Sequence, residues 1–151
     1  MIEALLRLIM PICPLTYLVL DGHFGNHNAL AMARQCALHL ISKLRCDAAL
    51  YFPYPGPYAG RGPHRKYGRK LDYDNLPVQY LKETMVAGHI QTCLYQMPLL
   101  HKEFMQPLNV VIIAKTNLRT QAHVVLFSSD LALAYAPLVD YYSLRFHIEI
   151  V

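Results

Sequence analysis

The hydrophobic pattern begins with two short apolar segments of different kinds. Residues 2–10 can form a short helix that Pro11 ends, because proline disrupts a helix interior. Residues 15–20 form a continuous apolar run with β-branched and aromatic members, which predicts a strand buried on both faces. Asp21 and a glycine follow this run, so an acidic residue is expected at the carboxyl end of a buried strand.

The pattern then changes to a helical one and back again. Asn26 or Asn28 can cap a helix over residues 29–40, which are rich in Ala, Leu, Met, Arg and Gln. Residues 39–45 are expected to form a second strand after a short connection. Strand, helix and strand over about 30 residues form a βαβ unit, so the two strands are expected to be parallel neighbours.

The composition changes abruptly at Phe52. Residues 52–75 are rich in proline, glycine, tyrosine and basic residues, which predicts an extended basic loop. Its cations are Arg61, Arg65, Lys66, Arg69 and Lys70, and its tyrosines are Tyr54, Tyr58, Tyr67 and Tyr73. Such a run suits phosphate contacts with some base stacking, and the alternative is a solvated, mobile loop.

The second half of the chain returns to regular elements. Residues 89–99, 108–114 and 122–127 are expected to be strands, with a hairpin connection over 116–121. A helical stretch is expected to begin at Leu131 after a Ser-Ser-Asp cap and to restart at a proline. These residues are Ser128, Ser129, Asp130 and Pro137.

The end of this last helix holds a specific trio. Tyr142, Arg145 and Glu149 have the spacing Tyr-x2-Arg-x3-Glu, which places the three side chains along one helix stripe. A phenol and a guanidinium can hold a phosphate while the carboxylate offers a metal ligand. Packing with a salt bridge, and a solvated glutamate, are the plainer interpretations of the same residues.

Composition limits the classes of protein that fit these elements. The chain has 151 residues, 54% of them apolar and 16% charged, which excludes disorder and favours one domain with a mixed α/β interior. The net charge of +4 permits a polyanionic partner without requiring one. Its four cysteines (Cys13, Cys36, Cys46 and Cys93) lack CxxC spacing and are expected to be buried free thiols.

Neither a membrane segment nor a separate metal site is expected from these patterns. The longest uncharged run near the start, residues 8–20, is too short to span a bilayer and contains two prolines. We therefore expect a soluble, cytoplasmic protein. His23 and His27 could share a helix face, but no third ligand lies near them in the sequence.

Asp21 gains meaning from its combination with the C-terminal trio. Alone, it is as often a turn or capping aspartate as a catalytic one. Together, the strand-end aspartate, the βαβ unit, the strands and the Tyr-x2-Arg-x3-Glu helix resemble the catalytic domain of DDE transposases of bacterial insertion sequences. The resembling group has the signature Tyr-x2-Arg-x3-Glu-x6-Lys, and its lysine would fall beyond Val151.

The resemblance implies a fold and a chemistry. The fold would be a partial RNase H-like core in residues 15–51 and 128–151, with a basic loop and β-rich insertion over 52–127. In the family, three carboxylates hold two Mg²⁺ ions that cut and join DNA. Asp21 and Glu149 would be two of these metal-binding catalytic carboxylates. Tyr142 and Arg145 would contact the DNA strand near the cut, together with the cations of the basic loop.

The resemblance also has departures from the family pattern. No aspartate precedes Asp21, so a strand carrying the first catalytic aspartate is not found. We therefore expect a single incomplete catalytic domain, weak magnesium binding, inactivity on its own, and an unpaired sheet edge beside residues 15–21. The expected partners are insertion-sequence ends, target DNA and full-length transposase. The alternatives are a non-enzymatic DNA-binding remnant that interferes with full-length transposase, and an unrelated α/β nuclease.

Overall fold

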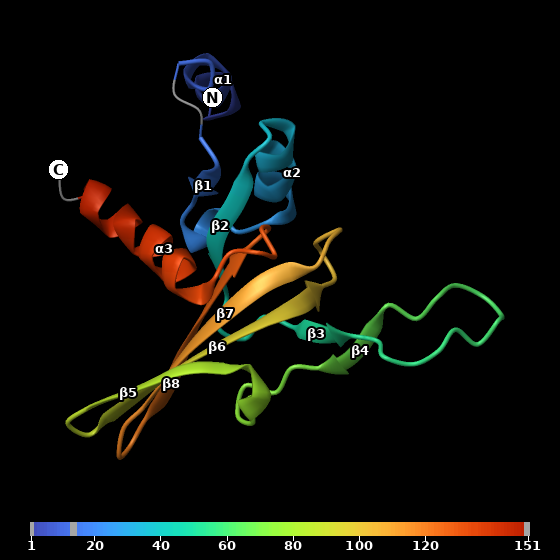
Figure 1. The fold of residues 1–151 in the computed structure, drawn as a ribbon, viewed down its shortest axis with the longest axis vertical. Helices are drawn as coiled ribbons and strands as arrows, with labels where there is room; N and C mark the ends of the chain where they lie inside the picture. The colour runs from blue at the N-terminus through green and yellow to red at the C-terminus, as the bar shows by residue number, and fades with distance from the viewer. Residues whose placement is uncertain (1, 13–14, 150–151) are drawn as a thin grey trace.

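The structure is a computed structural model that describes residues 2–12 and 15–149, apart from the side chains at positions 24 and 145–149. It is a mixed α/β fold, as predicted, and one long twisted sheet carries helices near one end (Figure 1). The helical segments are α1 (Ile2–Ile9), η1 (Gly22–Phe24), α2 (His27–Gln35), η2 (Val78–Tyr80) and α3 (Tyr135–Glu149). The strands are β1 (Tyr17–Val19), β2 (His39–Leu44), β3 (Leu50–Pro53), β4 (Tyr67–Lys70), β5 (Leu81–Ala87), β6 (Ile90–His101), β7 (Leu108–Thr116) and β8 (Gln121–Ser128).

The sheet has the strand order β1-β2-β8-β7-β6-β3-β4, with β5 also paired to β6. β1 and β2 are parallel, which confirms the predicted βαβ unit, and the other pairs are antiparallel. The strand β6 is long enough to pair with β5 near its start and with β3 near its end. The strand β1 lies at one end of the order, so the expected sheet edge at residues 15–21 is confirmed.

Two apolar clusters lie on opposite faces of the sheet, because successive strand residues point to opposite sides. The larger cluster packs α2 against the sheet through residues such as Leu30, Leu40 and Phe127. The smaller cluster packs α3 against the other face through Leu138 and Ile41. Figure 1 shows α3 starting against the sheet and running outward from it.

The first strand and the helix that follows it differ in part from their predictions. β1 packs against an apolar cluster on each face, Leu18 on one and Tyr17 and Val19 on the other, but all three residues are only half-buried, because an edge strand is covered on fewer sides. Asn26 caps α2 as predicted, its side chain accepting a hydrogen bond from the Ala29 amide at 3.0 Å. The helix ends at Gln35 rather than at position 40, since Ala37 adopts a left-handed φ of 56° and the chain turns into β2.

The predicted loop over residues 52–75 is a projecting hairpin. Its base is the antiparallel pair β3–β4, in which Tyr51 lies opposite Lys70 and Pro53 opposite Tyr67. Figure 1 shows this segment extending away from the sheet. We call residues 50–70 the arm. Few alternating apolar positions mark β3 and β4, which is why the sequence pattern predicted an irregular loop.

Later elements agree better with the sequence. The strands predicted over 89–99, 108–114 and 122–127 are confirmed as β6, β7 and β8. The strand β5 was not predicted, because six of its seven residues are exposed and lack an apolar alternation. The helix predicted from Leu131 begins at Tyr135, because Asp130 instead accepts the Ala132 amide in a turn.

The cysteines and the helices agree in part with what the sequence predicts. Cys36, Cys46 and Cys93 are free thiols as predicted, but none is buried, and Cys13 lies outside the described residues. Over residues 2–12 and 15–149, no helix has the length and apolar character needed to cross a membrane.

Candidate nucleic-acid interface

Asp21 occupies an exposed position directly after β1, where the chain turns into η1. Its backbone is fixed from below by Ser42, a fully buried residue of β2. The Ser42 hydroxyl oxygen lies 2.9 Å from the Leu20 carbonyl oxygen and 3.0 Å from that of Asp21, so the hydroxyl donates between them. The strand end is therefore held rigidly while the carboxylate of Asp21 is presented at the surface.

The turn after Asp21 passes very close to β2. A Cβ atom at Gly25 would lie 2.6 Å from the carbonyl oxygen of Lys43 and 2.9 Å from the hydroxyl oxygen of Ser42. A Cβ atom at Gly22 would meet Lys43 less closely, at 3.2 Å from its Cβ. Glycine at position 25 is thus required by the close approach of two backbone segments.

Asp21 borders a groove of about 850 Å³. The groove is lined by Asp21, Gly22, His23, Lys43, Leu44, Arg45, Cys46, Asp47 and His123. Arg45 and Asp47 form a bidentate pair with two distances of 3.1 Å, but both side chains are largely exposed, so the pair contributes little to stability. The groove therefore places one strand-end carboxylate beside cations that can attract a phosphate.

A smaller groove of about 250 Å³ continues from the first one. The two share Gly22, Lys43, Leu44 and Arg45. Its far side is formed by His101, Glu103 and Phe104 at the β6–β7 connection. Burial lowers the pKa of His101, which favours a neutral imidazole at that side.

An aromatic pair supports the outer wall of the larger groove. The rings of Tyr73 and His123 stack at a centroid distance of 4.5 Å with an interplanar angle of 13°. The Tyr73 hydroxyl donates to the Ala48 carbonyl at 2.6 Å, and burial raises the pKa of Tyr73 to about 12. These contacts hold the segment between β2 and β3, which carries Arg45 and Asp47, against the sheet.

The described side chains do not form a metal-binding cluster. Among the side chains that the structure describes in residues 2–12 and 15–149, no three His, Cys, Asp or Glu residues form a group that could hold an ion. His23 lies in η1 and His27 starts α2, so the two are not on one helix face. Within this part of the chain, the residues present do not fit a two-metal site.

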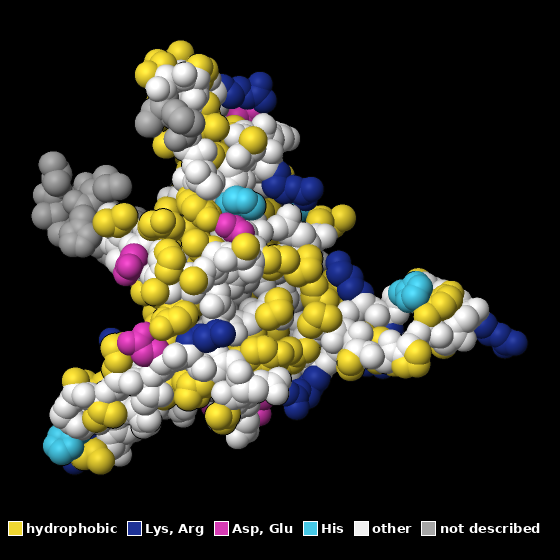
Figure 2. Space-filling model, in the orientation of Figure 1, with side chains coloured by type: hydrophobic (Ala, Val, Ile, Leu, Met, Phe, Trp, Pro, Cys, Tyr) yellow, Lys and Arg dark blue, Asp and Glu magenta, His cyan; other side chains and the backbone are white. Residues whose placement is uncertain are grey.

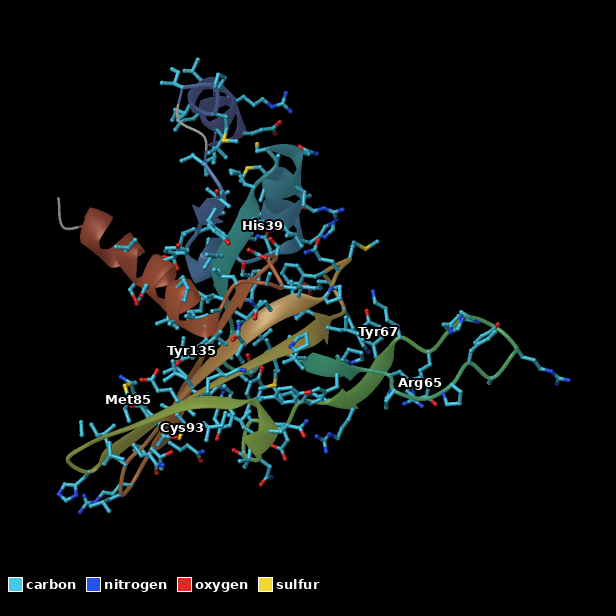
Figure 3. All side chains as sticks on the ribbon, viewed as in Figure 1. His39, Arg65, Tyr67, Met85, Cys93 and Tyr135 are labelled. Atoms are coloured by element: carbon cyan, nitrogen blue, oxygen red, sulfur yellow. The ribbon has the colours of Figure 1, made fainter. Side chains whose placement is uncertain are left out.

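Four cations lie over aromatic rings of the arm. Arg65 lies 4.8 Å from the Tyr54 ring centroid, and Arg69 lies 5.5 Å from that of Phe52. Two lysines complete the set: Lys66 over Tyr67 at 5.7 Å, and Lys102 over Tyr51 at 5.1 Å and Tyr67 at 5.9 Å. Figure 3 shows Tyr67 at the base of the arm and Arg65 farther along it.

The arm is cationic throughout. Residues 48–71 contain no Asp or Glu, and all five of the arm's Lys and Arg side chains belong to exposed residues. Figure 2 shows dark blue side chains on the arm and no magenta ones on its visible face. The loop is ordered by Tyr58, whose ring stacks on His64 at 3.8 Å and whose hydroxyl donates to Gly62 at 2.7 Å.

The C-terminal trio is placed only in part by the structure. Tyr142 is 6% exposed and packs with Leu138 and Ile41 in the smaller apolar cluster. The backbone of α3 is described through Glu149, but the side chains of Arg145 and Glu149 lie outside the described residues. The expected meeting of Asp21 with Glu149, and DNA contact by Tyr142 and Arg145, stay predictions.

The start of α3 is anchored to the sheet by a polar network. The Asn109 side-chain amide donates to the carbonyls of Asp130 and Leu133 at 3.0 and 2.7 Å, while Gln96 donates to the Asn109 oxygen at 2.9 Å. The Tyr17 hydroxyl donates to the Asp130 carboxylate at 2.6 Å. This hydrogen bond raises the pKa of Tyr17 to about 12 and lowers that of Asp130.

Several site residues were not indicated by the sequence pattern. Lys43 and Arg45 line both grooves, and Lys102 reaches the base of the arm from the β6–β7 connection. The strand order places β3 beside β6, which brings Lys102 to the base of the arm. Only the position of Lys43 and Arg45 at the end of a predicted strand could have suggested them.

Comparison with known families identifies the family of this chain. A family model described as DDE superfamily endonuclease matches residues 2–96, which is more than half of the chain. The match includes Asp21, both β1 and β2, and the arm, and it ends before α3. Searches of characterised proteins and of solved structures found no match. The chain therefore belongs to the DDE superfamily of endonucleases, a family of DNA-cutting, transposase-like enzymes.

Proposed function

We propose that this chain is a transposase-type member of the DDE superfamily that holds DNA with its arm and presents Asp21 to the bound strand. The observation that carries the proposal is the position of Asp21: a strand-end carboxylate, inside the matched segment, beside a groove lined by Lys43 and Arg45. Lys43 and Arg45 would hold a DNA phosphate next to Asp21 through charge-assisted hydrogen bonds. Glu149 is proposed as a second catalytic carboxylate, with Tyr142 and Arg145 near the cut strand.

Magnesium enters the proposal only as the metal that the family uses. Hard oxygen ligands suit Mg²⁺, and two such ions would supply Lewis-acid and nucleophile activation when bound. Asp21 is the candidate ligand in the larger groove, because it is a strand-end carboxylate that lies inside the matched segment. We therefore propose that this chain binds Mg²⁺ weakly and does not cut DNA by itself.

A nuclease assay tests this proposal. The purified chain is incubated with Mg²⁺ and labelled DNA carrying insertion-sequence ends, and products are compared with those of an Asp21→Asn variant. We expect binding without strand cleavage for both proteins, because phosphoryl transfer depends on several positioned charges. Metal-dependent cleavage that Asp21→Asn abolishes would contradict inactivity and support Asp21 as catalytic. Cleavage that persists in the variant would contradict the role of Asp21.

We infer a second candidate function from the cationic arm, which could bind DNA whether or not the chain cuts it. A chain that binds DNA without cutting it would compete with full-length transposase for DNA ends. Adding the chain to a transposition reaction should then lower the yield of strand transfer in proportion to its DNA affinity. An unchanged yield at concentrations that saturate the DNA would exclude this function.

A further inference from the structure

The aromatic residues of the arm are already occupied by its own side chains. Arg65 covers Tyr54, and Lys102 lies over both Tyr51 and Tyr67. Phe52 has Arg69 over its ring and also stacks on Tyr80, at a centroid distance of 6.0 Å and an angle of 21°. Each of these rings therefore already has a cationic partner within the protein.

The same holds at the tip of the arm. The ring of Tyr58 stacks on His64 at 3.8 Å, closer than any other pair of rings described in this structure. A nucleobase that stacked on Tyr58 would have to replace His64 or use the opposite ring face. Base stacking on the face that His64 occupies would thus disrupt a contact that orders the arm.

The cations are held in place by these rings and remain available to a partner. A guanidinium or ammonium over a ring is attracted by the negative face of the ring, which restrains a long side chain without neutralising its charge. Arg65, Lys66, Arg69 and Lys102 all belong to exposed residues. Among the described residues, the ion pairs join Arg7 to Glu3 and Arg45 to Asp47, and they involve none of these four cations.

Restrained, unneutralised cations are suited to a repeating anion. Preorganisation reduces the side-chain entropy that is lost when a phosphate is bound. An acid-free hairpin also has no carboxylate to repel the polyanion over residues 48–71. The nearest acid after it, Asp72, is engaged by the Asn75 side chain and the Asp74 amide.

We propose that the arm recognises the sugar–phosphate backbone of DNA and does not stack on bases, and that Lys102 is a further DNA-binding residue of the same surface. This inference rests on the proposed DNA-binding function and specifies which part of the DNA is bound. Lys102 comes from the β6–β7 connection, so it links the sheet to the arm through Tyr51 and Tyr67. The surface then acts independently of base sequence, because phosphate contacts carry no direct sequence information.

An oligonucleotide comparison tests the absence of base stacking. Fluorescence anisotropy measures the binding of the whole chain to a single strand and to a strand of equal length and phosphate number whose central bases are removed. We expect the two affinities to agree within about twofold, because the charges that release counterions are unchanged. A loss of about tenfold or more for the abasic strand would overturn the proposal, since stacking contributes on that scale for each base.

Variants test the role of Lys102. Lys102→Gln should weaken binding to both strands equally and reduce the slope of log affinity against log salt by about one. The matched control is Lys82→Gln, which removes an exposed lysine from β5, and it should leave affinity and slope unchanged. Equal effects of the two substitutions would overturn the assignment of Lys102. Absence of binding to intact duplex and single strands alike would instead contradict the proposed DNA-binding function itself.

Discussion

Gly25 lies where the turn after Asp21 crosses the backbone of β2, and its lack of a side chain fixes how Asp21 is presented. Gly25→Ala places a Cβ atom 2.6 Å from the Lys43 carbonyl oxygen, which is backbone and cannot rotate away. We expect a loss of about 1–3 kcal/mol in the free energy of unfolding, as for overpacked sites. Urea denaturation measures this change in the free energy of unfolding.

Gly22→Ala is the matched control for that substitution. Its Cβ atom would lie 3.2 Å from the Cβ of Lys43, so a shift of a few tenths of an ångström relieves the contact. We therefore expect Gly22→Ala to cost less than Gly25→Ala. Equal destabilisation by the two substitutions would show that the turn is not held as close to β2 as the structure indicates.

Tyr17 and Asp130 make the stability of the sheet edge depend on pH at both extremes. Their hydrogen bond lowers the pKa of Asp130, so its contribution is present above the unfolded pKa and is lost as pH falls through the folded value. The pKa of Tyr17 is raised from 10.0 to about 12, so its contribution is present below pH 10 and is lost between pH 10 and 12.

Tyr17→Phe removes this hydrogen bond. At pH 7 we expect a loss of about 1 kcal/mol, kept small because solvent screens the half-exposed pair. The difference from the unsubstituted chain should shrink both in acid and above pH 10. Unfolding curves across pH measure this, with Tyr141→Phe as the control because Tyr141 contacts the Tyr17 ring at 5.4 Å. A difference that stays constant with pH would contradict the account.

At the scale of elements, the position of α3 depends on the buried amide of Asn109. Asn109 is 3% exposed, and its two donated hydrogen bonds fix the connection from β8 to α3. Asn109→Ala removes the donor to the Asp130 carbonyl, while the Leu133 carbonyl keeps a hydrogen bond from the Gln96 side-chain amide at 2.8 Å. We expect a loss of about 1–3 kcal/mol, the scale of a buried polar group left unsatisfied.

The loss should be concentrated in α3. Hydrogen exchange followed by mass spectrometry should show faster exchange over residues 135–144 in Asn109→Ala, while β6 and β7 exchange as before. Asn75→Ala provides a control, since Asn75 is exposed and bonds only locally to Asp72. Uniform acceleration throughout the sheet would contradict a local anchoring role for Asn109.

Sequence patterns predicted some of these elements well and others poorly, for physical reasons. The strands β6, β7 and β8 follow from their apolar content, and Asn26 follows from the chemistry of helix caps. The strand β5 is mostly exposed, and β3 and β4 are held by pairing with a neighbour rather than by burial. No periodicity in the sequence records such pairing.

In the candidate site, too, some residues could be predicted from the sequence and others could not. Asp21 was predicted because a carboxylate at a strand end is a local feature, and the cations of the arm were predicted from composition. The groove formed by Lys43, Arg45 and His123 could not be predicted, because it requires β2 and β8 to be neighbours. The burial of Tyr142 likewise depends on how α3 packs on the sheet, which the spacing Tyr-x2-Arg-x3-Glu does not specify.

For the whole molecule, this DDE superfamily chain presents Asp21 next to a sheet edge, and its cationic arm is proposed to hold DNA. The metal prediction belongs to this scale, because it depends on carboxylates from distant elements. Titration calorimetry with Mg²⁺ should show weak, unsaturated binding, and Asp21→Asn should weaken it further, because the substitution removes the candidate ligand. Tight, saturable binding that Asp21→Asn abolishes would contradict the absence of a complete site.

The most direct measurement of the central claim is the salt dependence of DNA affinity. The arm variant changes Arg65, Lys66, Arg69 and Lys70 to Gln, and the control variant changes Arg34, Lys82, Lys115 and Arg119 to Gln. Both lower the formal net charge from +4 by four, so only the position of the lost charges differs. With duplex DNA, the account predicts that the arm variant binds more weakly and that its slope of log affinity against log salt falls by about three to four. The control variant should keep most of the affinity and most of the slope. Equal losses in the two variants, or no loss in the arm variant, would contradict DNA binding by the arm.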